Sequence, residues 1–188
     1  KQVNASTILD YGCGKQTLAK ALPELRVIGY DPAVPGLDAP PAPADLVVCT
    51  DVLEHVEPDC IDAVLDDLCR LAQKAAFVTV ATRPAVKTLA DGRNAHLTVQ
   101  PFSWWKQSFE SRFDIIEARE LEGFEFSLVL RALHADVEIV PEPEPTPAPA
   151  AATGPALADQ DRPTRMSIVQ LKGGQQLRFA TPNVLTTW

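Results

Sequence analysis

Short apolar runs alternate with amphipathic segments from the start of the chain to about residue 135. Continuous apolar runs that end at a turn are typical of buried strands, and they occupy residues 6–12, 25–32, 44–51, 75–82, 113–120 and 123–133. Apolar residues spaced three and four apart predict helices over residues 15–23, 58–75 and 102–113, the last with Ser103 as its N-cap. Strands that alternate with helices predict an α/β fold with a doubly wound, mainly parallel sheet. A tight turn joins the last two strands, so we expect them to form an antiparallel edge.

The periodic pattern stops near residue 135, which predicts one domain over residues 1–135. Residues 136–163 are rich in Pro, Ala and Glu, and this composition predicts an extended, semi-rigid linker. Residues 164–188 hold two alternating segments on either side of Gly173-Gly174, the pattern of a hairpin. A lone hairpin is only marginally stable in water. We therefore expect this tail to dock on the domain, to pair with a partner protein, or to begin a further domain.

Composition and charge exclude several classes of protein. The chain has 188 residues, is 46% apolar and carries a formal net charge of −8. It has no apolar run of about 18 residues, so we expect no membrane span. It has no basic stripe, so we do not expect general nucleic-acid binding. The first residues resemble no signal peptide, which predicts a cytoplasmic protein, and the first motif begins so early that an N-terminal segment is expected to be missing.

One local cluster of cations stands out against this acidic background. Arg83, Lys87 and Arg93 lie within a short stretch after the fourth predicted strand. Two interpretations stay open. The cluster is either a solvated surface loop or a rim that attracts an anionic ligand to a neighbouring site.

Polar or small residues follow each of the first four predicted strands. In a parallel sheet these strand ends meet at one edge, where ligands bind. The residues concerned are Asp10, Gly12, Gly14, Asp31, Thr50, Asp51, Thr82 and Arg83. The two glycines let a ligand approach the backbone, and Asp31 is placed to accept hydrogen bonds from two ribose hydroxyls. A nucleoside with a cationic, amino-acid-like arm fits this set, whereas the carboxylate of Asp10 would repel a pyrophosphate.

Three segments in order, LDYGCG, VIGYDP and ADLVVCTDVLEHV, resemble the class I S-adenosylmethionine-dependent methyltransferases, and NAHLTVQPFSWW resembles a later segment of that family. The resemblance covers residues 6 to 132 and implies a Rossmann-like fold with S-adenosylmethionine as cofactor. It implies that Gly12 and Gly14 approach the methionine part of the cofactor and that Asp31 binds its ribose. Asp10 would hold the turn and the methionine amino group. The same pocket would be lined by Pro32, Thr50 and Asp51.

The sequence departs from the family pattern at two places. Gln16 stands where the family often has a third glycine. Between Asp31 and the next strand there is only a short segment, with five prolines from Pro32 to Pro43, where the family usually has a further helix and strand. We therefore expect a stiff loop there and a sheet that is one strand short.

Histidines near the predicted site leave further alternatives open. Asp51, Glu54 and His55 share one face of a short helix, and His96 follows later in the chain. Together they could hold a divalent ion, an arrangement similar to that of small-RNA 2′-O-methyltransferases and ubiquinone-pathway O-methyltransferases. Because Leu-Glu-His is also common in metal-free members, we expect no metal ion. His96 and His55 are our candidate catalytic residues, as a general base or as substrate contacts, and a purely structural histidine is the alternative.

The adjacent tryptophans, Trp104 and Trp105, must face in different directions on a helix, so we expect one in the core and one half-exposed.

These observations predict an enzyme that transfers a methyl group from S-adenosylmethionine to a small or medium, anionic acceptor, at oxygen or nitrogen rather than carbon. A second hypothesis is a non-catalytic module that keeps the fold and recruits a protein partner through its tail. A nicotinamide-dependent oxidoreductase ranks last, because Thr17 stands where its glycine would be required.

Overall fold

The computed structural model describes residues 5–133, 166–170 and 176–180. Contacts divide the chain into two units. The larger one, Ala5–Val137, carries most of the secondary structure, and the smaller one contains strands β7 (Met166–Gln170) and β8 (Gln176–Ala180). These two strands pair in antiparallel fashion, with Met166 opposite Ala180. The predicted linker and Gly173-Gly174 lie outside the described residues, so the proposed boundaries of the linker and tail stay predictions.

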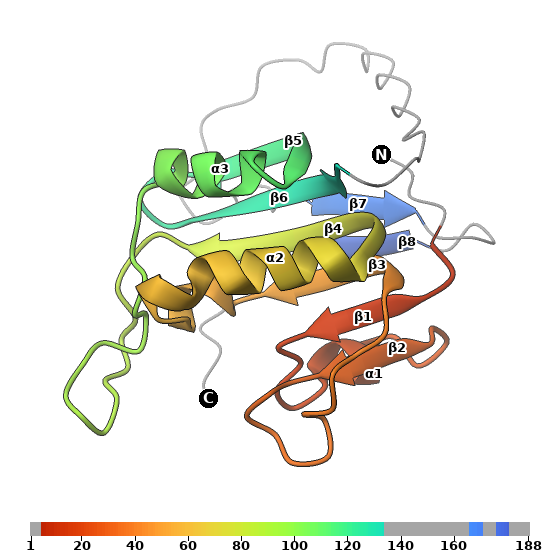
Figure 1. The fold of residues 1–188 in the computed structure, drawn as a ribbon, viewed down its shortest axis with the longest axis horizontal. Coiled ribbons are helices and arrows are strands. Elements are labelled where there is room, and N and C mark those ends of the chain that lie inside the picture. Colours follow the sequence, from red (N-terminus) through yellow and green to blue (C-terminus); the bar gives the residue numbers. More distant parts are fainter. Residues whose placement is uncertain (1–4, 134–165, 171–175, 181–188) are drawn as a thin grey trace, which may run out of the picture. The chain divides into compact units, whose positions relative to one another are not determined.

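A six-stranded sheet with the order β2-β1-β3-β4-β6-β5 forms the centre of the larger unit (Figure 1). Its strands are β1 (Ile8–Tyr11), β2 (Val27–Tyr30), β3 (Ala44–Thr50), β4 (Ala72–Ala81), β5 (Phe113–Leu121) and β6 (Glu125–Ala132). The first four strands are parallel, and β6 runs antiparallel to both of its neighbours. The expected mainly parallel α/β sheet is confirmed. The strand that reverses direction is β6, one position in from the edge, because its tight turn with β5 returns it between β4 and β5.

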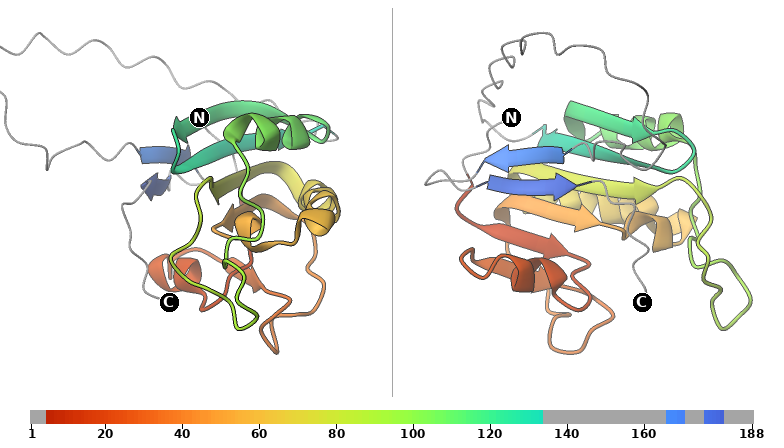
Figure 2. Two further views of the ribbon diagram at one scale, coloured as in Figure 1. Left: turned by 90° about the vertical axis from the view of Figure 1, so that its left-hand side faces the viewer. Right: turned by 180° about the vertical axis from the view of Figure 1, so that it is seen from behind.

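Helices cover both faces of this sheet. They are α1 (Thr17–Ala21), α2 (Ile61–Leu71) and α3 (Phe102–Glu110), with single 3-10 turns η1 (Leu53–His55) and η2 (Pro58–Cys60) before α2. Seen from the side and from behind, α1 lies on the opposite face from α2 and α3 (Figure 2). The doubly wound arrangement predicted from the alternation of strands and helices is therefore present.

The core between α2, α3 and the sheet follows from the apolar periodicity. The inward face of α2 carries Ile61, Leu65, Leu68 and Leu71, all buried. They pack with the aromatic side chains of Trp105, Phe109, Phe113 and Phe126. Burial of a side chain of this size stabilises the fold by about 1.5–3 kcal/mol. The packing fixes β3 and β4 side by side and so fixes the edge at which their ends meet.

Two predicted boundaries are wrong. The predicted helix over 58–75 ends at Leu71, because Ala72 already pairs with Ala44 in the sheet and strand pairing overrides the helical pattern. The last helix starts at Phe102 with Pro101 in the N-cap position, so Ser103 is inside the helix and caps nothing.

The loop between β2 and β3 replaces the helix and strand that the family usually has. No strand pairs with the outer side of β2 in the described part of the chain, so β2 forms an edge of the sheet. The expectation of a sheet that is one strand short is correct. Among the described residues, no helix is both long enough and apolar enough to cross a membrane.

Candidate functional site

The turn after β1 is built on positive φ angles. Gly12 and Gly14 have φ of 76° and 47°, which glycine adopts without strain. The backbone N–H groups of Gly12 and Cys13 both donate to the carbonyl oxygen of Tyr30, at 2.8 and 3.0 Å. The turn is thereby fastened to the end of β2. A Cβ on Gly12 would lie only 2.4 Å from Cγ2 of Val52, so the close approach at this glycine is made by a protein side chain.

Asp31 lies beside this turn, as predicted. Its Oδ2 accepts the N–H of Gly14 at 2.9 Å, and its Oδ1 accepts the N–H of Ala33 at 2.9 Å. The carboxylate therefore holds the glycine turn and the start of the next loop together. Each oxygen still has a second lone pair that a ligand hydroxyl could use. Pro32, which follows, is exposed.

Asp10 is a buried carboxylate at the end of β1. Its side chain is 6% exposed, and within the described ranges it has no hydrogen-bond partner. Burial raises the pKa of Asp10 to about 6, and the nearby charge of Asp31 contributes to the increase. A buried carboxylate without a partner matches a ligand that brings a positive charge.

An open hollow of about 460 Å³ lies next to the glycine turn. It is lined by Gly14, Lys15, Gln16, Lys20, Val34, Pro35, Gly36 and Leu37. The loop that replaces the missing helix thus forms one wall, and the turn and α1 form the other. The hollow, the turn and the two aspartates are the features that could hold the nucleoside cofactor.

Thr50 and Asp51 lie at the same edge of the sheet, at the end of β3. Thr50 is half-buried and pairs in register with Thr79 of β4. Asp51 has a φ of 55°, an unusual conformation for a residue other than glycine, and its side chain is exposed. Desolvation by the surrounding protein raises the pKa of Asp51, while His55 and His96 act in the opposite direction.

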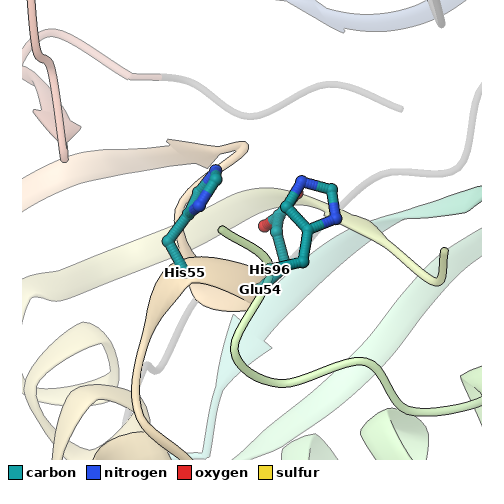
Figure 3. Close-up of side chains that lie close together, drawn as sticks. All are labelled: Glu54, His55 and His96. Carbon is teal, nitrogen blue, oxygen red and sulfur yellow. The ribbon is translucent and has the colours of Figure 1, made fainter. Parts of the chain in front are cut away.

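His55 and His96 are brought together from distant parts of the sequence. Their ring centroids are 4.9 Å apart, with the rings nearly perpendicular. Figure 3 shows Glu54 and His55 on the segment after β3 and His96 on a separate loop, with the Glu54 carboxylate beside the His96 ring. The nearest ligand atoms of Glu54, His55 and His96 all lie within 4.8 Å of one another.

Backbone contacts set the orientation of both rings. Nδ1 of His55 lies 2.8 Å from the carbonyl oxygen of Ala95, and Nδ1 of His96 lies 2.6 Å from that of Arg83. A carbonyl oxygen can only accept, so each Nδ1 must carry the proton. In the neutral ring, Nε2 then keeps its lone pair. Partial burial lowers the pKa of His96, which favours this neutral form.

The loop that carries His96 is fastened at two places. The side chain of Asn94 accepts the N–H of Ala85 at 2.9 Å and the N–H of His96 at 2.9 Å. The N–H of Thr98 donates to the carbonyl oxygen of Glu54 at 3.0 Å. These bonds determine how close the imidazole comes to Glu54, and sequence spacing alone did not reveal them.

Glu54 is more deeply buried and closer to both histidines than the sequence alone indicated. Its side chain is 1% exposed. Oε1 accepts the N–H of Ala81 at 3.0 Å, whereas Oε2 is buried and has no hydrogen-bond partner in the part of the chain that the structure describes. Burial raises the pKa of Glu54 to about 8, and the charge of Asp51 adds to this effect. The signal in the sequence was a glutamate directly after a buried strand and before a histidine.

One member of the predicted cation cluster, Arg93, is neutralised by neighbouring acids. Arg93 forms ion pairs with Glu57 and Asp91, both at 2.7 Å. The guanidinium of Arg83 lies 4.1 Å from the ring centroid of Phe124, a cation–π contact. Arg93 is therefore not available to an anionic ligand.

The two tryptophans divide as predicted. Trp105 is fully buried, and Trp104 is half-buried.

The chain is similar to known methyltransferases in sequence and in fold. The profile of the family described as "Methyltransferase domain" matches residues 1–126. No curated protein sequence matches the chain. A 1,6-didemethyltoxoflavin N1-methyltransferase from Burkholderia thailandensis, solved with 1,6-didemethyltoxoflavin and S-adenosylhomocysteine, superimposes with a TM-score of 0.52 at 15% identity. The alignment covers 69% of this chain and 71% of that one.

Two further solved structures share this fold. The N-methyltransferase NodS of Bradyrhizobium japonicum, in complex with S-adenosylhomocysteine, has a TM-score of 0.50 at 13% identity and covers 70% of this chain and 80% of its own. DhpI, also in complex with S-adenosylhomocysteine, has a TM-score of 0.51 at 17% identity and covers 67% of this chain and 76% of its own.

Proposed function

This chain belongs to the methyltransferase-domain family, and we propose that it transfers a methyl group from S-adenosylmethionine to oxygen or nitrogen of a small or medium acceptor. The resemblance stated from the sequence is confirmed by the family match. The observation that carries the proposal is the buried carboxylate of Asp10 beside the glycine turn and Asp31. Neighbours with this fold were solved with S-adenosylhomocysteine, which agrees with the cofactor expected here.

We assign the cofactor to the strand ends beside the first turn, next to the hollow that Gly14 lines. Asp10 would face its ammonium group, and the free lone pairs of Asp31 would accept from its ribose hydroxyls. Gly12, Gly14 and Pro32 would shape the turn around it, and Thr50 and Asp51 would line the neighbouring strand end. S-adenosylmethionine supplies an electrophilic methyl group on a sulfonium, so the protein mainly aligns the reactants.

We place the acceptor next to the two histidines. The lone pair on Nε2 of the neutral His96 can take the proton of a hydroxyl or ammonium acceptor, and His55 contacts the acceptor from the other side. For an anionic acceptor, Arg83 and Lys87 are the cations of the cluster that remain, because Arg93 is held in its own ion pairs. One neighbour was solved with a small molecule, 1,6-didemethyltoxoflavin, which supports a small acceptor.

Titration calorimetry with S-adenosylhomocysteine and its 2′-deoxy analogue tests the cofactor site. We expect the missing hydroxyl to weaken binding to the wild type by about tenfold, and to have little effect on Asp31→Ala, as in a double-mutant cycle. Asp38→Ala is a matched control, because Asp38 accepts the N–H of Gly36 at 3.0 Å in the same loop. A wild type that binds neither compound would overturn the proposal.

The second candidate is a binding module that keeps the cofactor but performs no transfer. Product formation with a panel of phosphorylated, carboxylated and neutral hydroxyl and amine acceptors separates the two. An anionic acceptor is supported if dephosphorylation of an active compound abolishes turnover. Cofactor binding without turnover on any acceptor would instead favour a module that recruits a partner, and pull-down with and without residues 164–188 would test the tail.

A further inference from the structure

One carboxylate oxygen and two imidazole nitrogens converge at the sheet edge, next to the proposed cofactor site. They belong to Glu54, His55 and His96. His55 and Glu54 adjoin each other in one 3-10 turn, and His96 comes from the loop between β4 and α3. A carboxylate and two imidazoles are the donor set that divalent transition metals prefer.

The two imidazoles are already prepared for coordination. Each has its Nδ1–H fixed on a backbone carbonyl, that of Ala95 or that of Arg83. This second-shell bond is the usual way in which a metal-binding histidine is oriented and its Nε2 lone pair directed toward the ion. Two neighbouring rings are fixed in the same way, and among the described residues neither Nε2 atom has a hydrogen-bond partner, which favours a shared ligand.

The carboxylate gives an independent indication of a missing partner. Oε2 of Glu54 is buried and unpartnered within the described ranges, while Oε1 is held by the N–H of Ala81. A buried polar atom without a partner is unfavourable by about 1–3 kcal/mol and is rare unless an unseen group satisfies it. A cation between Glu54 and the two rings would satisfy this oxygen.

We infer that Glu54, His55 and His96 bind one divalent transition-metal ion. Metal–ligand distances of about 2.0–2.2 Å place tetrahedral donors about 3.5 Å apart. The present separation of up to 4.8 Å therefore has to contract by about 1 Å when the ion binds. Asp51, close enough to influence both imidazoles, adds negative charge beside the ion.

Three protein ligands leave at least one coordination position open, as in catalytic rather than structural metal sites. The metal site itself does not depend on the proposed function. Only the role of the ion in methyl transfer rests on that function. The oxygen of a hydroxyl acceptor would occupy the open position, where the cation lowers the pKa of that hydroxyl and its proton passes to solvent. In the loaded protein this contact replaces direct proton transfer to His96.

Metal binding is measured first on the wild-type chain, stripped with EDTA. Co²⁺ titration, followed by visible absorption, is expected to saturate at one ion per chain. Mn²⁺ at substoichiometric amounts is expected to broaden the ring resonances of both His55 and His96. This second measurement needs no variant and so does not depend on whether a substitution folds.

Variants then assign the ligands. His55→Ala, His96→Ala and Glu54→Gln should each weaken Co²⁺ binding by at least about tenfold. Asp38→Ala, in the loop after β2, should not, and S-adenosylhomocysteine binding reports that each variant is folded. Absence of saturable binding to the wild type, or Mn²⁺ that leaves the resonances of His55 and His96 unbroadened, would overturn the metal site. If the metal site fails but the protein still binds the cofactor and turns over an acceptor in EDTA, the methyltransferase proposal stands. If the protein binds the metal but methylates no acceptor, only the methyltransferase proposal fails.

Discussion

Asp10 offers the sharpest test of how the fold and the cofactor are linked. Its carboxylate is buried at the end of β1, and its pKa is raised to about 6 by burial and by the charge of Asp31. A charge in this position destabilises the free protein but suits a cationic ligand. Asp10→Asn removes the charge and keeps the shape, so it should affect stability and binding in opposite directions.

The effect on stability follows from the linkage between protonation and folding. Between about pH 4 and pH 6 the folded protein holds a proton that the unfolded chain releases, so the free energy of unfolding falls as pH rises through this window. The pKa change from 3.8 to about 6 corresponds to about 3 kcal/mol, which solvent screening at a partly accessible carboxylate reduces to about 1–2 kcal/mol. Asp10→Asn should therefore be more stable than the wild type above pH 6 by about 1–2 kcal/mol in urea unfolding, with no gain at pH 4.

The effect on binding has the opposite sign. If the ammonium of S-adenosylhomocysteine lies against ionised Asp10, affinity falls about tenfold for each pH unit below the pKa of the free protein. Calorimetry should thus show the wild type binding about tenfold more weakly at pH 5 than at pH 7.5. Asp10→Asn should bind about 10–100-fold more weakly than the wild type at pH 7.5 and show little further loss at pH 5.

The possible outcomes distinguish a role of Asp10 in binding from a role in stability. A variant that is stabilised but keeps full affinity would show that Asp10 does not contact the ligand. A variant that is destabilised at pH 7.5 would show that the carboxylate has a stabilising partner, contrary to the geometry. The ratio between wild type and variant at the same pH isolates the effect of Asp10.

Two further substitutions test the packing around the site. Gly12→Ala should destabilise the protein by more than about 2 kcal/mol, because its Cβ would lie 2.4 Å from Cγ2 of Val52 at a φ of 76°. Gly36→Ala is the matched control, with a φ of 87° and open space around it, and should lose only about 1 kcal/mol; equal losses in urea unfolding would refute the steric argument. Trp105→Phe should change stability by less than about 1.5 kcal/mol, since it also removes a buried indole N–H without a partner in the described part of the chain, whereas Phe109→Ala should lose about 3–5 kcal/mol. A loss above 3 kcal/mol for Trp105→Phe would mean that the indole N–H is satisfied.

The order of strands and helices could be predicted because it depends on short-range pattern. All six strands of the sheet lie where continuous apolar runs occur, and α2 lies where apolar residues recur at helical spacing. The placement of Asp31 beside the glycine turn could also be predicted, since parallel neighbouring strands bring their ends to one edge. The helix end at Leu71 could not, because pairing of Ala72 with Ala44 depends on a distant strand.

Local sequence thus determined the α/β class, the parallel sheet edge and the pair of aspartates that mark the candidate cofactor site. Tertiary structure decided which side chains meet there. It placed Val52 against Gly12, left an oxygen of Glu54 buried without a partner in the described residues, and brought His96 next to His55. The physical reason is that apolar periodicity and turn residues act over a few positions, whereas these contacts depend on strand register and on how the loop of His96 is fastened by Asn94 and Thr98.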